Sequence, residues 1–298
     1  MLTPYAYHLV NVFAETYFGG NPLAVFPQAD GLTDQQMQLI ARQFNLSETV
    51  FVHQTTESSA VRKLRIFTPD YELPFAGHPT IGAAFVLHQQ LNLPETYLLQ
   101  TQASLVKLFH EAKQICFGLQ NHIDVEVIHD NLPQYTQLLG LSESDIAQIA
   151  WVNTGSRQLL IQLTSLNALK TCQIHPALFQ QIVKQSALYL WFVEQNQANV
   201  RLFFGSNGAV VEDPGTGSAA ANLGGLCLKN GLTPLNWRIY QGDEIQRPNR
   251  LTLQVDESET IYVGGKVIAV GCGELFVPSG EGESVYFSLY GNIFTFKI

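Results

Sequence analysis

The chain has 298 residues, of which 46% are hydrophobic and 14% charged, a composition typical of a globular and not of a disordered protein. Its net charge of −9 and its pI of about 5.3 argue against a general nucleic-acid binder, because its 16 lysines and arginines are scattered and form no basic stripe. The chain has no apolar run of membrane-span length, no signal-peptide pattern at its start and no closely spaced cysteine pair, so we expect a reduced, cytoplasmic protein without membrane or nucleic-acid partners.

The first half of the chain alternates short apolar segments with two helical patterns. Thr33 is an N-cap candidate with Gln36 in the capping-box position, which predicts a helix that runs to Phe44. A second helix is predicted over Thr80–Leu91, where small residues permit close packing. Strands are expected at residues 5–13, 23–26, 61–67, 96–102, 104–109 and 114–119.

Two titratable residues of the first half lie at the ends of predicted elements. Glu48 stands where the chain passes from the first helix into an apolar strand. A buried glutamate there would have a raised pKa, which suits a residue that transfers protons. The alternative is a solvated glutamate at a strand edge. His78 precedes the second helix and is either a structural histidine or part of a site at the start of that helix.

The second half repeats this plan after a predicted crossover at residues 119–124. Helices are expected at residues 133–139 and 176–185. Strands are expected at residues 150–153, 158–163, 187–194, 199–204, 237–241, 251–255, 261–264 and 266–270, and the tail, residues 285–297, is also strand-like.

A glycine-rich stretch, Asp213–Ser218, precedes a run of small residues that predicts another helix. Gly215 and Gly217 let the backbone turn tightly. The first amide groups of such a helix lack partners within the helix, and together with the helix dipole they favour a bound carboxylate or phosphate. The alternative is an ordinary helix capped by Thr216 or Ser218.

A similar stretch, Gly77–Ala84, occurs in the first half, and the two halves align at one offset. Arg65 and Arg201 are 136 positions apart, as are Thr80 and Thr216. A weak repeat of half the chain length indicates two similar domains and not a solenoid, whose periods are shorter. Two helix N-termini could then face each other across a cleft between the domains, where ligand sites are common.

The usual cofactor and nucleophile signatures are absent from the sequence. There is no G-x-x-x-x-G-K-[ST] loop, no N-terminal G-x-G-x-x-G, no G-x-S-x-G elbow and no cluster of residues with metal-ligand spacing. What remains is a cleft with acidic and imidazole groups between two helix N-termini. Such a site can hold a small carboxylic acid and stabilise the charge that develops when a proton leaves carbon.

Several motifs in combination resemble the PhzF (phenazine biosynthesis-like) family, and the match runs from the first strand to about residue 273. The sequence departs from the family pattern at Gly215, where alanine is more common, and at Gln246, where glycine is usual. The motifs are residues 18–26, 46–52, 65–69, 72–80 and 212–220, with Gln241-Gly242 and Arg247-Pro248 as a late motif.

The resemblance implies an α+β protein of the diaminopimelate-epimerase-like fold, with two pseudo-symmetric domains that each wrap a curved, barrel-like sheet around a central helix. We assign residues 1–118 to the N-terminal domain and residues 119–283 to the C-terminal domain. The tail, residues 284–298, can return to complete the first domain. The resemblance also implies a homodimer that needs neither a metal nor an organic cofactor.

The relative that gives the family its name is an isomerase of a dihydro-hydroxyanthranilic acid, so the resemblance implies a small carboxylic acid as substrate. Glu48 would take a proton from one carbon and return it to another, while His78 and Asp213 assist the transfer or orient the substrate. Epimerase relatives carry a cysteine pair where this chain has Gly77 and Asp213, which argues against two-thiol racemisation. The residues implied in substrate binding are Ser47, Gly77, Gly217 and Ser218.

Three hypotheses therefore stand. The first is an isomerase with Glu48 as general acid/base. The second is an epimerase or racemase of an amino-acid-like substrate that uses Glu48 and Asp213 on opposite faces. The third is a non-catalytic interaction protein that keeps the fold, against which the intact set of Glu48, His78 and Asp213 weighs.

Overall fold

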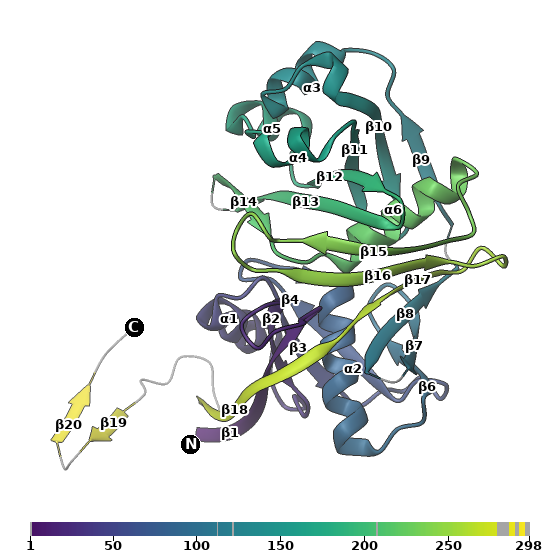
Figure 1. Cartoon of the computed structure of the whole chain (residues 1–298). Helices are drawn as coiled ribbons and strands as arrows, with labels where there is room; N and C mark the ends of the chain where they lie inside the picture. Colours follow the sequence, from purple (N-terminus) through teal and green to yellow (C-terminus); the bar gives the residue numbers. More distant parts are fainter. Residues whose placement is uncertain are drawn as a thin grey trace.

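The computed structural model describes residues 2–111, 113–120, 122–206 and 208–278, together with the backbone of residues 286–289 and 292–295. In this part of the chain, 18 strands form one curved sheet that wraps around two helices, α2 (Gly77–Leu91) and α6 (Gly217–Lys229) (Figure 1). Helix α2 packs against strands of the first half, whereas α6 packs mainly against strands of the second half. This confirms a mixed α/β architecture with a large sheet and few helices.

The first half follows the predicted order of elements. The capping box at Thr33 is present, because the Thr33 hydroxyl accepts from the backbone N–H of Gln36 and the Gln36 side chain accepts from that of Thr33. Helix α2 starts three residues earlier than predicted, at Gly77. The other elements are β1 (Leu2–Val12), β2 (Asn21–Phe26), α1 (Asp34–Phe44), β3 (Thr49–His53), β4 (Arg62–Phe67), β5 (Glu72–Leu73), β6 (Thr96–Gln100), β7 (Leu105–Glu111) and β8 (Gln114–Leu119).

Besides a 3₁₀ turn, the second half contains a strand and a helix that the sequence patterns did not predict, β9 (Asp124–Val127) and α4 (Leu166–Thr171). Helix α4 has only six residues, too few to show a helical period. The others are α3 (Leu132–Leu139), a 3₁₀ turn (Glu143–Asp145), β10 (Ile146–Asn153), β11 (Arg157–Leu163), α5 (Pro176–Ile182), β12 (Ala187–Glu194), β13 (Gln197–Ser206), β14 (Ala209–Asp213), β15 (Leu235–Gln241), β16 (Asn249–Val255), β17 (Ile261–Gly265) and β18 (Val267–Pro278).

The two arginines that suggested the repeat, Arg65 and Arg201, each stand two residues before a phenylalanine, and these two Arg-x-Phe motifs make matching contacts. Arg65 pairs with Glu72 at 2.8 and 2.5 Å, and its guanidinium lies 5.1 Å from the ring centre of Phe67. Arg201 pairs with Glu212 at 3.0 and 2.7 Å and lies 4.9 Å from the ring of the phenylalanine two residues on. At these two motifs, the similarity in sequence is accompanied by a similarity in contacts.

The last strands tie the two halves together. Strand β17 pairs with β8, and β18 pairs with β1 along its whole length, so the sheet closes between elements from opposite ends of the chain. Strand β18 runs to Pro278, eight residues beyond the predicted end. One apolar core surrounds α2 and α6 continuously.

In the predicted tail, β19 (Tyr286–Leu289) and β20 (Asn292–Thr295) pair with each other. The remaining residues of the tail lie outside the described part of the chain. The prediction that the tail returns to the first domain concerns mostly these residues.

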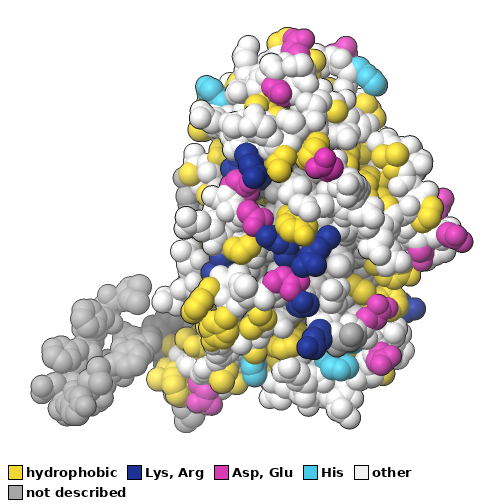
Figure 2. Space-filling model, in the orientation of Figure 1, with side chains coloured by type: hydrophobic (Ala, Val, Ile, Leu, Met, Phe, Trp, Pro, Cys, Tyr) yellow, Lys and Arg dark blue, Asp and Glu magenta, His cyan; other side chains and the backbone are white. Residues whose placement is uncertain are grey.

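The surface mixes charges of both signs. Basic and acidic side chains lie side by side in the middle of the face in Figure 2, over the region where Figure 1 places β15 and β16. Two ion pairs of these strands join Arg238 to Glu15 at 2.9 Å and Arg250 to Asp243 at 2.7 Å. None of the helices described by the structure combines the length and the hydrophobicity needed to cross a bilayer.

Candidate active site

The N-termini of α2 and α6 meet directly at two glycines. A Cβ atom added to Gly77 would lie 2.9 Å from the Cα of Gly217, and one added to Gly217 would lie 3.2 Å from the Cα of Gly77. A side chain at Gly77 would therefore force the two helices apart. The residues before the helices, Ala76 and Thr216, make no side-chain cap to the first amides of the helices.

The turn before α6 is held by Gln241 and not by an ordinary helix cap. Thr216 stands in the N-cap position, but its hydroxyl donates to the carboxylate of Asp213. The Gln241 amide accepts from the Thr216 N–H at 3.1 Å and donates to the Asp213 carbonyl oxygen at 2.9 Å. The capped-helix alternative is thus wrong for Thr216, and the Gln241-Gly242 motif has a structural role that its sequence did not reveal.

Glu48 is mostly buried, because only 16% of its side chain is exposed and its Oε2 atom is fully covered. Its Oε2 atom lies 3.5 Å from Nε2 of His78, too far for a normal hydrogen bond, and neither atom has a hydrogen-bond partner among the described residues. Burial, and secondly the charge of Asp213, raises the pKa of Glu48 to about 8. Burial lowers the pKa of His78 to about 3, so the imidazole is neutral at physiological pH.

Asn21 connects these residues, although the sequence analysis did not single it out. Its Nδ2 atom donates to the Gly215 carbonyl oxygen at 3.0 Å and to Oδ1 of Asp213 at 3.1 Å, and it lies 3.5 Å from Nδ1 of His78. The Gly215 carbonyl can only accept, which fixes the orientation of the amide. Because Nδ1 of His78 faces this NH2 group, which cannot accept, we assign the hydrogen of the neutral ring to Nε2, which lies 3.5 Å from Glu48.

Asp213 is buried, and both of its carboxylate oxygens are occupied. Oδ1 accepts from Asn21 and lies 3.5 Å from the Ser47 hydroxyl, and Oδ2 accepts from the Thr216 hydroxyl. Burial raises the pKa of Asp213, while the hydrogen bonds from Thr216 and Asn21 oppose the rise. Asp213 is therefore placed to hold the two halves of the site together.

A cavity of about 540 Å³ brings most of the predicted site residues together. Of these, Ser47, Glu48, Asp213 and Ser218 line it. His78 lies behind Glu48, and the two glycines form the seam between the helices without lining the cavity. A ligand would thus sit beside the seam and not between the helix ends. Three lining residues that the sequence analysis did not single out are Tyr71, Arg157 and Gln158.

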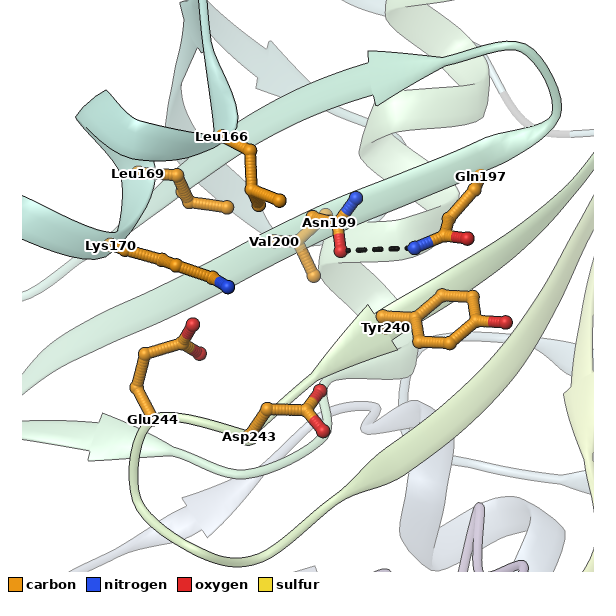
Figure 3. A pocket seen from close by; sticks show the side chains of 9 residues that line it. All are labelled: Leu166, Leu169, Lys170, Gln197, Asn199, Val200, Tyr240, Asp243 and Glu244. Carbon is orange, nitrogen blue, oxygen red and sulfur yellow. Dashed lines mark hydrogen bonds between the residues drawn. The ribbon is translucent and has the colours of Figure 1, made fainter.

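A second cavity of about 520 Å³ shares no residue with the first. Lys170 and Glu244 point toward one another across it, and Gln197 donates to Asn199 at 3.3 Å (Figure 3). None of the predicted site residues lines it, nor does any of the buried atoms without a partner in the described part of the chain. Within the described residues there is also no group of three or more His, Cys, Asp or Glu side chains that could hold a metal ion.

Comparison with known proteins agrees with the motif-based prediction. The family model of phenazine biosynthesis-like proteins (PhzC-PhzF) matches residues 10–273. An uncharacterized isomerase of Pasteurella multocida is 99% identical over 283 residues, which cover 95% of this chain and 98% of that protein. The trans-2,3-dihydro-3-hydroxyanthranilate isomerase of Pseudomonas chlororaphis is 33% identical over 281 residues, or 90% of this chain and 98% of that one.

Among solved structures, a predicted epimerase from Pseudomonas aeruginosa is 27% identical, with a TM-score of 0.76 over 91% of this chain and 99% of that one. The mixed α/β fold is thus shared with a protein described as an epimerase. Taken with the match over residues 10–273, these similarities show that the chain belongs to the phenazine biosynthesis-like (PhzF) family.

Proposed function

We propose that the protein is an isomerase that moves a proton between two carbons of a small carboxylic acid, with Glu48 as the general acid/base and without a cofactor. The observation that carries this proposal is the environment of Glu48. Its carboxyl group is buried at the wall of a cavity, has an oxygen without a partner among the described residues, and has a pKa raised to about 8. Such a group gains and loses a proton readily near neutral pH.

In the first step, the Glu48 carboxylate takes a proton from a substrate carbon. The electron pair of the broken C–H bond moves into the conjugated π system of the substrate. The Nε2–H group of His78, directed at Glu48 at 3.5 Å, stabilises the carboxylate form. The start of α6, with the hydroxyl of Ser218, faces the developing negative charge. In the second step, Glu48, whose acid proton exchanges with water, delivers a proton to another carbon, so the product is an isomer of the substrate.

The two halves of the site favour one base over two. In β3, Thr49 pairs with the phenylalanine of the first Arg-x-Phe motif, and in β12, Leu188 pairs with that of the second. The preceding residues, Glu48 and Ala187, are therefore equivalent, and both line the cavity. A methyl group stands where a symmetric second base would be, and Asp213 has both carboxylate oxygens engaged. This supports a proton shift over an epimerisation that uses bases on opposite faces.

The domain and dimer assignments rest on the family resemblance, and the location rests on the cysteines and the N-terminal sequence. We propose that residues 1–118 and 119–283 form two domains, with the tail 284–298 returning to the first, and that the protein is a cytoplasmic homodimer. Sedimentation velocity over a range of concentrations tests the dimer, and a chain that stays monomeric throughout would contradict it.

Turnover in deuterated water tests the proposed reaction. The protein is incubated with trans-2,3-dihydro-3-hydroxyanthranilate, the substrate in the name of the Pseudomonas relative, and with a panel of small cyclic and amino-acid-like acids. We expect a positional isomer that carries deuterium at the newly protonated carbon, seen by NMR. A product that differs only in configuration would favour the epimerase hypothesis, and the absence of exchange with every acid would contradict the proposal.

A further inference from the structure

The second half of the molecule supplies the cavity with a buried chain of amide side chains. Asn222 of α6 accepts hydrogen bonds from the backbone N–H of Thr154 at 2.9 Å and from the Thr154 hydroxyl at 2.8 Å. Its Nδ2 atom donates to the carbonyl oxygen of Ser156 and to Oε1 of Gln158, both at 2.8 Å. Asn222 is fully buried, and Gln158 is 5% exposed. The last hydrogen bond of this series runs from Nε2 of Gln158 to the hydroxyl of Ser218, at 3.3 Å.

The direction of every hydrogen bond in this chain follows from its two backbone groups. The N–H of Thr154 can only donate, and the carbonyl of Ser156 can only accept, so the amide of Asn222 has one possible orientation. Its Nδ2 atom therefore faces Gln158, whose oxygen must turn toward it. The nitrogen of Gln158 is left to face the cavity side, where the Ser218 hydroxyl accepts from it.

We infer that Gln158 and Asn222 are positioning residues that hold the Ser218 hydroxyl as a hydrogen-bond donor toward the cavity. An amide N–H cannot accept, so the hydrogen of Ser218 has to point away from Gln158. The hydroxyl lies in the first turn of α6, whose backbone amides are also donors. This corner of the cavity therefore offers hydrogen-bond donors and binds an acceptor group. A carboxylate forms the strongest hydrogen bonds with such donors.

This inference deepens the proposed function, because it rests on that function for the identity of the acid. It adds that binding of the carboxylate by Ser218 depends on two residues, Gln158 and Asn222, that lie outside the family motifs. The carboxylate end of the substrate and the proton-transferring Glu48 are then held by different halves of the molecule.

A double-mutant cycle with a stable acid tests the inference. The probe is 3-hydroxyanthranilate, and its binding is measured by calorimetry to the wild type, Gln158→Glu, Ser218→Ala and the double variant. A glutamate at position 158 keeps an oxygen that accepts from Asn222. The Asn222 amide and the α6 N-terminus favour its ionised form, so the hydroxyl of Ser218 turns its hydrogen toward the new carboxylate. We expect Gln158→Glu to weaken binding at least about tenfold, and to have little further effect once Ser218 is alanine.

The charge control is Gln185→Glu, the same change at another residue of the cavity wall. Repulsion between charges would persist without the Ser218 hydroxyl, whereas an effect through that hydroxyl would vanish. Equal losses from Gln158→Glu in both backgrounds would overturn the inference.

A neutron structure of the deuterated protein tests the same point without a ligand. We expect the deuterium of Ser218 to point into the cavity, and a deuterium directed at Gln158 would overturn the inference. If 3-hydroxyanthranilate does not bind the wild type, the proposed substrate class is contradicted, while the neutron result still decides the orientation of Ser218.

Discussion

The cavity has two walls that are built on the same plan but carry different chemistry. The first half supplies Glu48, backed by His78, and burial moves their pKa values to about 8 and about 3. The second half supplies Gln158 and Ser218, neutral groups joined to Asn222 by hydrogen bonds of known direction. Under the proposed function, the wall with Glu48 transfers protons and the wall with Ser218 binds the acid.

The equivalence of Glu48 and Ala187 states this difference most simply. The residue after each of them, Thr49 or Leu188, pairs with the phenylalanine of an Arg-x-Phe motif. A carboxyl group on one side and a methyl group on the other make the site chemically one-sided, which suits a single base that moves one proton.

The contact between the N-termini of α2 and α6 is common to both walls of the cavity. We expect its disruption to have the largest effect on the rate of proton exchange. Gly77→Ala places a Cβ 2.9 Å from backbone of α6, where nothing can rotate away. We expect the rate of proton exchange to fall about 100-fold or more, since small misplacements of reacting groups are costly. The control is Gly271→Ala, whose added Cβ meets no atom within 4 Å. Near-normal exchange in Gly77→Ala would show that the seam does not position the site.

The pH dependence of stability separates the titratable wall from the neutral one. The pKa of Glu48 rises from 4.5 to about 8 on folding, so its stabilising effect is complete below about pH 4.5 and is lost as the pH rises toward 8. The pKa of His78 falls on folding, so its contribution is present above pH 6.5 and is lost as the pH falls.

In Glu48→Gln, the decline in the free energy of unfolding between pH 5 and pH 8 should flatten by on the order of 3 kcal/mol. Urea unfolding at several pH values measures this, with the exposed Glu257→Gln as the control. An unchanged slope in Glu48→Gln would mean that Glu48 titrates as an ordinary carboxyl group.

The matching Arg–Glu pairs offer a comparison of stability between the two halves. The side chains of Arg201 and Glu212 are 12% and 8% exposed, against 20% and 24% for Arg65 and Glu72. Removing one partner of the more buried pair leaves a charge that water reaches less easily. We expect Arg201→Met to cost about 1 kcal/mol more unfolding free energy than Arg65→Met, measured by urea unfolding. An equal or larger cost at Arg65 would reverse this ranking.

Tyr71 should give the smallest effect, although it lines the cavity near Glu48. Tyr71 is 56% exposed, and its partial burial raises its pKa, as do, more weakly, the charges of Glu48 and Asp70. Tyr71→Phe keeps the ring and removes only the hydroxyl, so we expect a change in KM of about threefold or less and an unchanged kcat. A fall in kcat of tenfold would place a second proton-transferring group in the cavity and break the one-base description.

Local patterns predicted much of the fold. The capping box at Thr33 placed the start of α1 correctly, because a cap is made by neighbours in sequence. The start of α2 was placed at Thr80 and lies at Gly77, where the reason for the glycine is a contact with Gly217, 140 positions away. The end of β18 was missed for the same kind of reason, since its partner is β1 at the other end of the chain.

The residues of the site also fall into those that local sequence motifs indicated and those that only the structure revealed. Glu48, Ser47, Asp213 and Ser218 stand in motifs and meet at one cavity as expected. Asn21 and Gln158 act through hydrogen bonds to residues 192 and 60 positions away, and an amide side chain in a strand carries no local signal of such a bond. Residue types that can change protonation state stand out in a sequence, whereas the neutral residues that orient them become visible only in three dimensions.

The most direct test of the central claim is the rate at which solvent deuterium enters the bound acid in Glu48→Gln. Glutamine keeps the size and polarity of the side chain but cannot take up the proton. We expect exchange to fall at least about 100-fold while the protein stays folded and still binds the acid. Exchange within a factor of three of the wild type would contradict the assignment of Glu48 as the proton carrier.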